Sequence, residues 1–226
     1  MQNRNSVLVP SSTFKCNYMN KVDGRFLMMD IFDSSVKVCF FDPQYRGVLE
    51  KLHYGNEGKG RGKARSSLQQ MDEEVIKNFI REIERVLLPS GYLFLWLDSF
   101  HLCQWKGEWL RDTDFQIVDL ITWDKGKMGM GYRARHRCEY LVVVQKKPVR
   151  AKGTWTKHNI PDVWSEKILN KNHPHAKPVG LQLVLIEATT KENDFVLDPA
   201  AGGYSVFKAC ELLKRNFIGG DIEFGN

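Results

Sequence analysis

A short segment of the chain places an acid, a proline and an aromatic ring side by side. Val36–Phe41 is rich in β-branched and aromatic residues, and Asp42-Pro43-Gln44-Tyr45 follows it directly. Proline restrains the backbone and lacks an N–H, so Asp42 and the Pro43 carbonyl form two fixed acceptors. These acceptors suit the two N–H bonds of a weakly nucleophilic planar amine, with Tyr45 stacked on its face. The alternative is that Asp42-Pro43-Gln44-Tyr45 forms only an ordinary turn with no functional role.

A turn near the C-terminus forms the second candidate site. It connects a strand predicted over residues 195–197 to a helix predicted over residues 206–214. The turn carries an acid, two glycines and a hydroxyl, namely Asp198, Gly202, Gly203 and Ser205. Its backbone N–H groups can approach a nucleotide or adenosyl ligand. The next predicted strand, residues 216–220, ends on Asp221, where an acid can hydrogen-bond a ribose diol.

Two segments combine positive charge with glycine, which favours contact with a polyanion. Residues 55–67 have no periodicity and read as a long loop near Asp42. Residues 125–137 lie between two predicted strands, so they form a hairpin tip whose apolar side chains suit stacking or wedging. The candidate nucleic-acid contacts are Lys59, Arg61, Lys63, Arg65, Lys125, Lys127, Tyr132, Arg133, Arg135 and Arg137. A solvated linker and a solvated hairpin tip are the alternatives.

Length and composition favour a single domain over residues 1–226. The 226 residues are 42% hydrophobic, which suffices for one core. No apolar run approaches the ~20 residues of a membrane span, and residues 1–12 lack a signal-peptide pattern, so we expect a cytoplasmic protein with no membrane partner. The five scattered cysteines and the isolated His173 and His175 suggest neither disulfides nor a metal site. A formal charge of +6 agrees with a polyanionic partner.

The rest of the chain alternates strands with helices, as in a doubly wound α/β sheet. Asp72 can cap a helix that carries an apolar stripe, and residues 89–91 are expected to end this helix. Residues 92–97 are continuously apolar, as expected of a strand buried on both faces. Further strands are predicted over residues 24–30, 115–123 and 140–145, and further helices over residues 100–110 and 179–190.

Together these features resemble the S-adenosylmethionine-dependent amino DNA methyltransferases, in the permuted (beta) subclass where the catalytic block precedes the cofactor block. The resemblance spans nearly the whole chain. It implies a doubly wound, Rossmann-like, seven-stranded methyltransferase sheet with an antiparallel hairpin, circularly permuted. It also implies a short target-recognition segment over residues 146–172, with recognition shared by residues 55–67, residues 125–137 or a second subunit.

The catalytic motif of this family is Asp-Pro-Pro-Tyr. Asp42, Pro43 and Tyr45 match it, and Gln44 stands in place of the second proline. The resemblance therefore implies that Asp42, Pro43 and Tyr45 are catalytic.

Two further family motifs concern the cofactor. The motif His-Pro-x-x-Lys-Pro is matched by His173, Pro174, Lys177 and Pro178. The motif Asp-Pro-Phe-x-Gly-x-Gly is matched by Asp198, Pro199 and Gly202, with Ala200 for the phenylalanine and Tyr204 for the last glycine. By this resemblance, S-adenosylmethionine would be bound by Asp30, Asp42, His173, Lys177, Asp198, Ala200, Gly202, Gly203, Ser205 and Asp221.

The activity implied by the resemblance is methyl transfer to the N6 amine of adenine in a specific DNA sequence. The base must be flipped out, because an amine inside a duplex is out of reach. An aspartate at the first catalytic position usually accompanies adenine in this family. The alternatives are a cytosine-N4 or RNA-adenine methyltransferase, or a non-catalytic nucleic-acid-binding module of the same fold. The expected partners are DNA and either a second copy of the chain or a cognate restriction-system protein.

Overall fold

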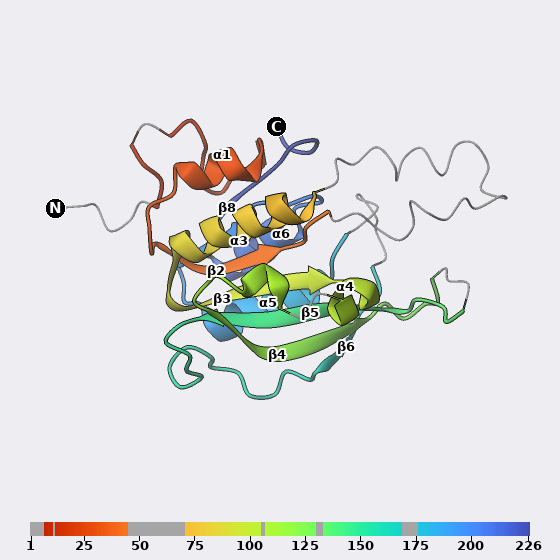
Figure 1. Cartoon of the computed structure of the whole chain (residues 1–226). Helices are drawn as coiled ribbons and strands as arrows, with labels where there is room; N and C mark the ends of the chain where they lie inside the picture. The colour runs from red at the N-terminus through yellow and green to blue at the C-terminus, as the bar shows by residue number, and fades with distance from the viewer. Residues whose placement is uncertain (1–6, 11, 45–70, 105–106, 130–132, 169–175) are drawn as a thin grey trace, which may run out of the picture.

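The computed structural model describes residues 7–10, 12–44, 71–104, 107–129, 133–168 and 176–226, which form one sheet with helices on both faces (Figure 1). The helices are α1 Gly24–Met29, α3 Glu73–Val86, α4 Ser99–Gln104, α5 Val179–Thr189 and α6 Ser205–Leu213, with a 3-10 turn at Glu108–Leu110. The strands are β1 Asn20–Lys21, β2 Val36–Phe41, β3 Leu87–Leu97, β4 Phe115–Asp124, β5 Cys138–Lys146, β6 Val163–Ser165, β7 Phe195–Asp198 and β8 Asn216–Asp221.

The described strands lie in the order β1-β8-β7-β2-β3-β5-β4-β6. β5 is antiparallel to both of its neighbours, and the other pairs are parallel. The chain runs from β7 to β8 in one direction and from β2 to β3 in the other, so the order reverses between β7 and β2. Ligands of doubly wound sheets bind outside the strand ends at this kind of reversal.

This topology confirms the predicted α/β sheet with an antiparallel hairpin. The structure has eight strands where the resemblance implies seven. The three-residue β6, from the segment predicted for target recognition, pairs with the exposed side of β4 and so extends the sheet at that edge.

Alternate side chains of β2 enter two separate cores. Cys39 and Phe41 pack with α1 and α3 on one face, whereas Val38 and Phe40 pack with α5 and α6 on the other. This alternation is the two-residue period of a strand buried on both sides. β2 is therefore fixed from both faces, and so is the start of the segment at Asp42 that follows it.

Residues 24–30 form helix α1 and the turn after it, so the predicted strand is wrong. Asp23 caps the helix by accepting the Arg25 N–H at 2.9 Å. The first helical residue, Gly24, packs so closely on the turn after β7 that a β-carbon there would lie 2.0 Å from the Pro199 carbonyl oxygen. A short apolar run fits a strand and a helix equally well, and the capping aspartate is the signal that separates them.

Helix α3 begins as predicted, with Asp72 accepting the Val75 N–H at 2.8 Å. It ends at Val86, and β3 begins at the next residue, so residues 89–91 lie inside a strand and not in a turn. Pairing with β2 passes from Leu87 to Tyr92 across a register shift. Proline and glycine are therefore accommodated in a bulge.

The other predicted elements agree with the structure, apart from the predicted helix over residues 100–110. That region contains the short α4 and the 3-10 turn, with residues 105–106 outside the described part of the chain. No helix among the described residues is long and apolar enough to cross a membrane.

Candidate active site

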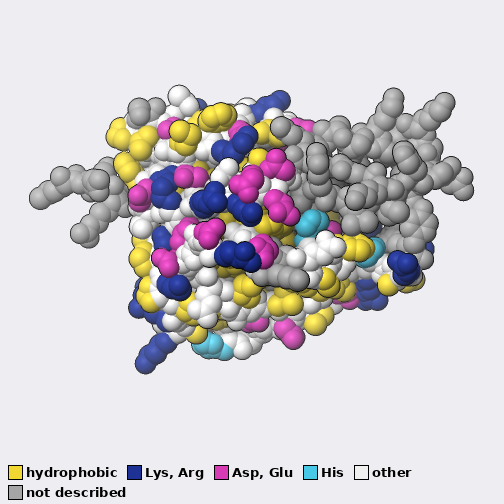
Figure 2. All heavy atoms as spheres, viewed as in Figure 1, with side chains coloured by type: hydrophobic (Ala, Val, Ile, Leu, Met, Phe, Trp, Pro, Cys, Tyr) yellow, Lys and Arg dark blue, Asp and Glu magenta, His cyan; other side chains and the backbone are white. Residues whose placement is uncertain are grey.

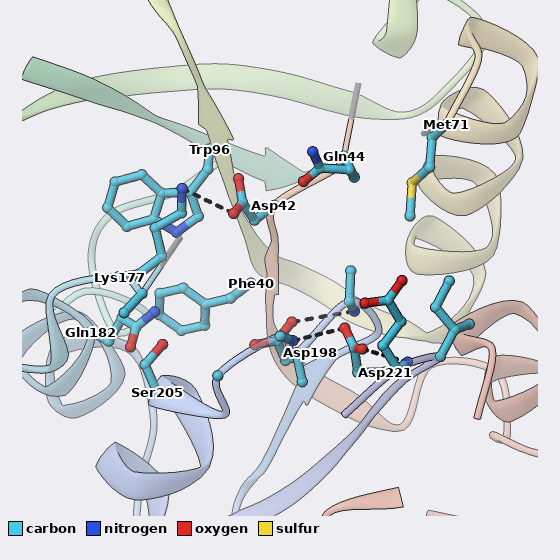
Figure 3. A pocket seen from close by; sticks show the side chains of 17 residues that line it. Phe40, Asp42, Gln44, Met71, Trp96, Lys177, Gln182, Asp198, Ser205 and Asp221 are labelled. Carbon is cyan, nitrogen blue, oxygen red and sulfur yellow. Dashed lines mark hydrogen bonds and ion pairs between the residues drawn. The ribbon is translucent and has the colours of Figure 1, made fainter. Parts of the chain in front are cut away.

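Three acids lie at the carboxyl ends of three neighbouring parallel strands. Asp221 ends β8, Asp198 ends β7, and Asp42 directly follows β2. All three line one cavity at the reversal of strand order, with Lys177 extending toward Asp42 (Figure 3). The sheet topology therefore brings the two candidate sites of the sequence together.

Lys177, just before α5, links Asp42 to a second acid. Its ammonium nitrogen lies 2.9 Å from Oδ2 of Asp42, 2.9 Å from Oε2 of Glu139 and 5.0 Å from the ring centroid of Trp96. Burial alone would lower the pKa of Lys177, but the carboxylates of Asp42 and Glu139 outweigh it and raise that pKa above its ordinary value. Lys177 is therefore charged at neutral pH and fixes one oxygen of Asp42.

Asp198 is a buried carboxyl group, 6% exposed, on the wall of the cavity. Its Oδ1 accepts the Ala200 N–H at 3.4 Å. Burial raises the pKa of Asp198 well above its ordinary value, because it outweighs the opposing hydrogen bond from the Ala200 N–H. The nearby carboxylates of Asp42 and Asp221 add to the rise, and the ammonium of Lys177 opposes it. A cationic ligand in the cavity would stabilise the ionised form of this acid.

The turn between β7 and α6 has a tyrosine where the family motif has its last glycine. Tyr204 has a φ of 55°, in the left-handed region that glycine adopts most easily. Its side chain is buried, and its hydroxyl lies 2.8 Å from the carbonyl oxygen of Asn20 and 3.2 Å from that of Phe224. These contacts offset a backbone cost of roughly 1–2 kcal/mol, so the turn keeps its shape without the glycine.

The Asp221 carboxylate belongs both to the turn and to the cavity wall. Its Oδ2 accepts the Gly202 N–H at 3.0 Å, and its Oδ1 accepts the N–H groups of Glu223 at 2.9 Å and Phe224 at 3.0 Å. A carboxylate has about four acceptor positions, so capacity is left for a ligand hydroxyl. Removing this side chain would also loosen the turn.

Most of the predicted cofactor residues line the cavity, namely Asp42, Lys177, Asp198, Ala200, Gly202, Gly203, Ser205 and Asp221. Asp30 is not among the lining residues. It caps the C-terminus of α1, because the segment expected to be a strand is a helix. Pro43 is buried between Asp42 and Gln44. Tyr45 and His173 lie outside the described residues.

The hairpin between β4 and β5 uses several of its cations internally. Nε of Arg137 lies 2.6 Å from Asp124, and this pairing lowers the pKa of Asp124 well below its ordinary value. Nε of Arg135 donates to the Gly129 carbonyl at 2.6 Å. Lys125 pairs with Glu139 at 3.2 Å, whereas Lys127 and Arg133 are exposed. The remaining predicted contacts, Tyr132, Lys59, Arg61, Lys63 and Arg65, fall outside the described residues.

Sequence reasoning missed Glu139, Trp96 and Gln182. Trp96 and Gln182 line the cavity. Nε1 of Trp96 and Oε1 of Gln182 are buried and have no hydrogen-bond partner within the described part of the chain. Trp96 could have been found as an aromatic residue near the end of the strand next to β2, and Gln182 as an amide in an apolar helix. Glu139 had no local signal, because its partner Lys177 is 38 residues away.

Comparison with known proteins identifies the family. A family model described as DNA methylase matches residues 36–225. The Type II methyltransferase M.HhaII of Haemophilus parahaemolyticus is 60% identical over 211 residues, covering 93% of this chain and 92% of that protein. M2.DpnII, a Type II methyltransferase of Streptococcus pneumoniae, is 28% identical over 96% of this chain and 85% of its own length. The chain therefore belongs to the DNA methylase family.

Solved structures show the same fold. The M1.HpyAVI–SAM complex superposes with a TM-score of 0.64 at 20% identity, over 90% of this chain and 92% of that one. The cytosine-N4-specific PvuII DNA methyltransferase superposes with a TM-score of 0.69 at 14% identity, over 93% of this chain and 85% of that one. The fold is thus shared with a methyltransferase that is specific for cytosine N4.

Replacing Asp198 by asparagine should stabilise the protein at high pH. The folded-state pKa of Asp198 is raised, so ionisation costs folding free energy once the pH exceeds the ordinary aspartate value of about 3.9. Asparagine avoids that cost and keeps the oxygen that accepts from Ala200. Thermal unfolding should show a higher Tm for Asp198→Asn at pH 8, by about 2–4 °C per kcal/mol, and little change near pH 4.

The matched control is Asp112→Asn, because Asp112 is exposed and away from the cavity. It should leave Tm unchanged at both pH values. A Tm for Asp198→Asn that falls at pH 8, or that shifts equally at both pH values, would contradict the assignment of Asp198 as a destabilising buried carboxylate.

Proposed function

We propose that the chain transfers a methyl group from S-adenosylmethionine to the N6 amine of an adenine flipped out of a specific DNA sequence. The observation that carries this proposal is one cavity lined by Asp42, Lys177, Asp198 and Asp221. When bound, S-adenosylmethionine supplies an electrophilic methyl group attached to a positively charged sulfur. The SAM complex of M1.HpyAVI, which has the same fold, supports this choice of cofactor.

The cavity residues suit the chemical groups of that cofactor. Asp198 is a buried acid that a positive charge would stabilise, and Oε1 of Gln182 is a buried acceptor with no partner among the described residues. Asp221 retains acceptor capacity for a ribose hydroxyl. Ser205 begins helix α6, whose N-terminal N–H groups favour a carboxylate. Ile222, 43% exposed on the cavity wall, offers an apolar surface to an aromatic ring.

Asp42 would accept a hydrogen bond from the target amine. Lys177 contacts Oδ2 of Asp42, and Oδ1 has no partner within the described part of the chain, so Oδ1 is the oxygen suited to the amine. The Pro43 carbonyl would accept the second N–H, as the family motif implies. Two acceptors orient the nitrogen lone pair and stabilise the positive charge that develops on nitrogen as the N–C bond forms and the S–C bond of the cofactor breaks. S-adenosylhomocysteine would be the leaving group, and the methylated nitrogen would lose one proton, which the Asp42 carboxylate can accept.

The target base must leave the duplex to reach Asp42. Flipping costs roughly a few kcal/mol. Tyr45, three residues after Asp42 in the sequence, would offset part of that cost, since stacking on an aromatic ring contributes roughly 1–3 kcal/mol per base.

Adenine is the proposed target because Asp42 occupies the first catalytic position, where an aspartate usually accompanies adenine in the resembling family. The fold does not separate adenine from cytosine, since the cytosine-N4-specific PvuII enzyme shares it. A carboxylate accepts equally well from either exocyclic amine. Cytosine N4 is therefore the second candidate target.

The product identifies the target directly. DNA lacking prior methylation would be incubated with the protein and S-adenosylmethionine labelled in its methyl group, then hydrolysed to nucleosides. We expect label in N6-methyldeoxyadenosine, and heat-denatured protein as the control should give none. Label in N4-methyldeoxycytidine would overturn the choice of adenine. Label in neither nucleoside would overturn the proposed methyl transfer.

The exposed cations of the β4–β5 hairpin are the proposed DNA contacts within the described residues. On the face seen in Figure 2, basic and acidic side chains intermingle around α3, where Lys77 pairs with Glu74 and Arg85 pairs with Glu82. Lys127 and Arg133 form no ion pair within the described part of the chain. Their charges are therefore available to phosphates. The predicted contacts within residues 55–67 lie outside the described residues and stay a prediction.

The Type II designation of the relatives supports a place for this protein in a restriction–modification system. A cognate restriction-system protein is accordingly a proposed partner. A homodimer and a target-recognition role for residues 146–172 stay predictions from the family resemblance.

Neutralising Lys127 and Arg133 together should weaken DNA binding and flatten its salt dependence. Each lost phosphate contact lowers the slope of log K against log salt by about 0.9, so the double glutamine variant should lose about 1.8. The matched control is Lys77→Gln with Arg81→Gln on α3, which removes the same charge from another surface. DNA affinity measured at several salt concentrations gives both slopes. Equal slopes for the two double variants would show that the hairpin tip is only solvated.

A further inference from the structure

Four charged side chains form a continuous row that ends at the proposed catalytic acid. Asp42, Lys177, Glu139 and Lys125, here called the charge ladder, are joined by contacts of 2.9, 2.9 and 3.2 Å. Their side chains are 30%, 12%, 29% and 24% exposed, so the contacts are partly shielded from water. Positive and negative groups alternate, and the row carries no net charge when all four are ionised.

Glu139 balances the attraction between Lys177 and Asp42. The ammonium of Lys177 lies at equal distances from Oδ2 of Asp42 and Oε2 of Glu139, so the two carboxylates compete for it. Coulombic attraction at such distances stays strong near a protein surface, because the effective dielectric there is about 20 and not that of bulk water. Without Glu139, the ammonium of Lys177 would be drawn toward Asp42 alone and would be free to bridge both of its oxygens. Oδ1, the oxygen suited to the target amine, would then also be held by the lysine.

We propose that Glu139 is a positioning residue for Asp42, acting through Lys177, and that Lys125 completes the ladder by neutralising the far oxygen of Glu139. The inference rests on the methyl transfer proposed above. It assigns Lys125 to the active site, where its charge alone had suggested DNA contact.

The charge state of Glu139 agrees with this role. Burial alone would raise the pKa of Glu139, but the ammonium groups of Lys177 and Lys125 outweigh burial and lower that pKa to about 2. Glu139 is therefore ionised at any pH at which the protein would be assayed. The base of the β4–β5 hairpin holds both Glu139 and Lys125, and the Lys125 N–H donates to the Arg137 carbonyl at 3.1 Å.

The test is Glu139→Gln, which keeps the size of the side chain and removes its charge. With saturating DNA and cofactor, the single-turnover rate of methyl transfer should fall about tenfold to a hundredfold, since a ~1 Å displacement of a catalytic group costs up to about a hundredfold. Calorimetric affinity for S-adenosylmethionine and the affinity for DNA should stay within about threefold, because a rate loss without a binding loss is the signature of transition-state positioning. Glu139→Asp, which keeps the charge, should restore part of the rate.

Two further variants separate positioning from other roles. Glu187 on α5 forms an ion pair with Lys157, and neither residue lines the cavity. Glu187→Gln removes this carboxylate and should leave the rate unchanged. Lys125→Met should lower the transfer rate without changing the salt dependence of DNA binding. An unchanged transfer rate with a flatter salt dependence would instead show that Lys125 contacts DNA, and would contradict its place in the ladder.

Two outcomes would overturn the inference alone. One is a wild-type rate for Glu139→Gln. The other is an equal loss of rate and cofactor affinity in Glu139→Gln and Glu139→Asp, accompanied by a lower Tm, because that result would assign Glu139 to the fold. If the wild-type protein transfers no methyl group, the proposed function itself fails, and this inference fails with it.

Discussion

The ion pair between Lys177 and Asp42 stabilises the cluster of acids that lines the cavity. The sheet brings three carboxylates, Asp42, Asp198 and Asp221, to the ends of neighbouring strands, where like charges oppose one another. Lys177 is the buried cation set against them, and it reaches Asp42 only because α5 packs on the core formed by β2 and β7. The strand order, the two-sided packing of β2 and the start of α5 together fix one carboxylate oxygen.

Local signals explain how much of the site could be predicted from the sequence. Asp42 and the Asp198 turn each combine a strand, a special backbone residue and an acid within ten residues, so both could be recognised without tertiary information. Ion pairs between distant residues carry no such signal, which is why the sequence did not indicate Glu139 or its contacts with Lys125 and Lys177. The errors in the fold have similar causes. Residues 24–30 fit two periodicities, and residues 89–91 contain turn-forming residues that the structure accommodates in a bulge.

Several cavity residues lower the folding stability of the protein when no ligand is bound. Asp198 is buried with a raised pKa, and Nε1 of Trp96 and Oε1 of Gln182 lack partners within the described residues. A buried unpaired polar group typically costs about 1–3 kcal/mol. Such groups are expected where a ligand supplies the missing partner, and their clustering around one cavity is consistent with a cofactor that carries both charge and hydrogen-bonding groups.

The proposed methyl transfer depends most on the carboxylate of Asp42, and the most direct test is single-turnover methyl transfer by Asp42→Asn. Asparagine keeps the shape of the side chain and removes the charge that orients the amine. With wild-type protein and Asp112→Asn as references, we expect the transfer rate to fall at least about a hundredfold, within the range of catalytic acid and base groups. A rate for Asp42→Asn within about twofold of wild type would contradict this expectation, because the methyl group would then be accepted without this carboxylate.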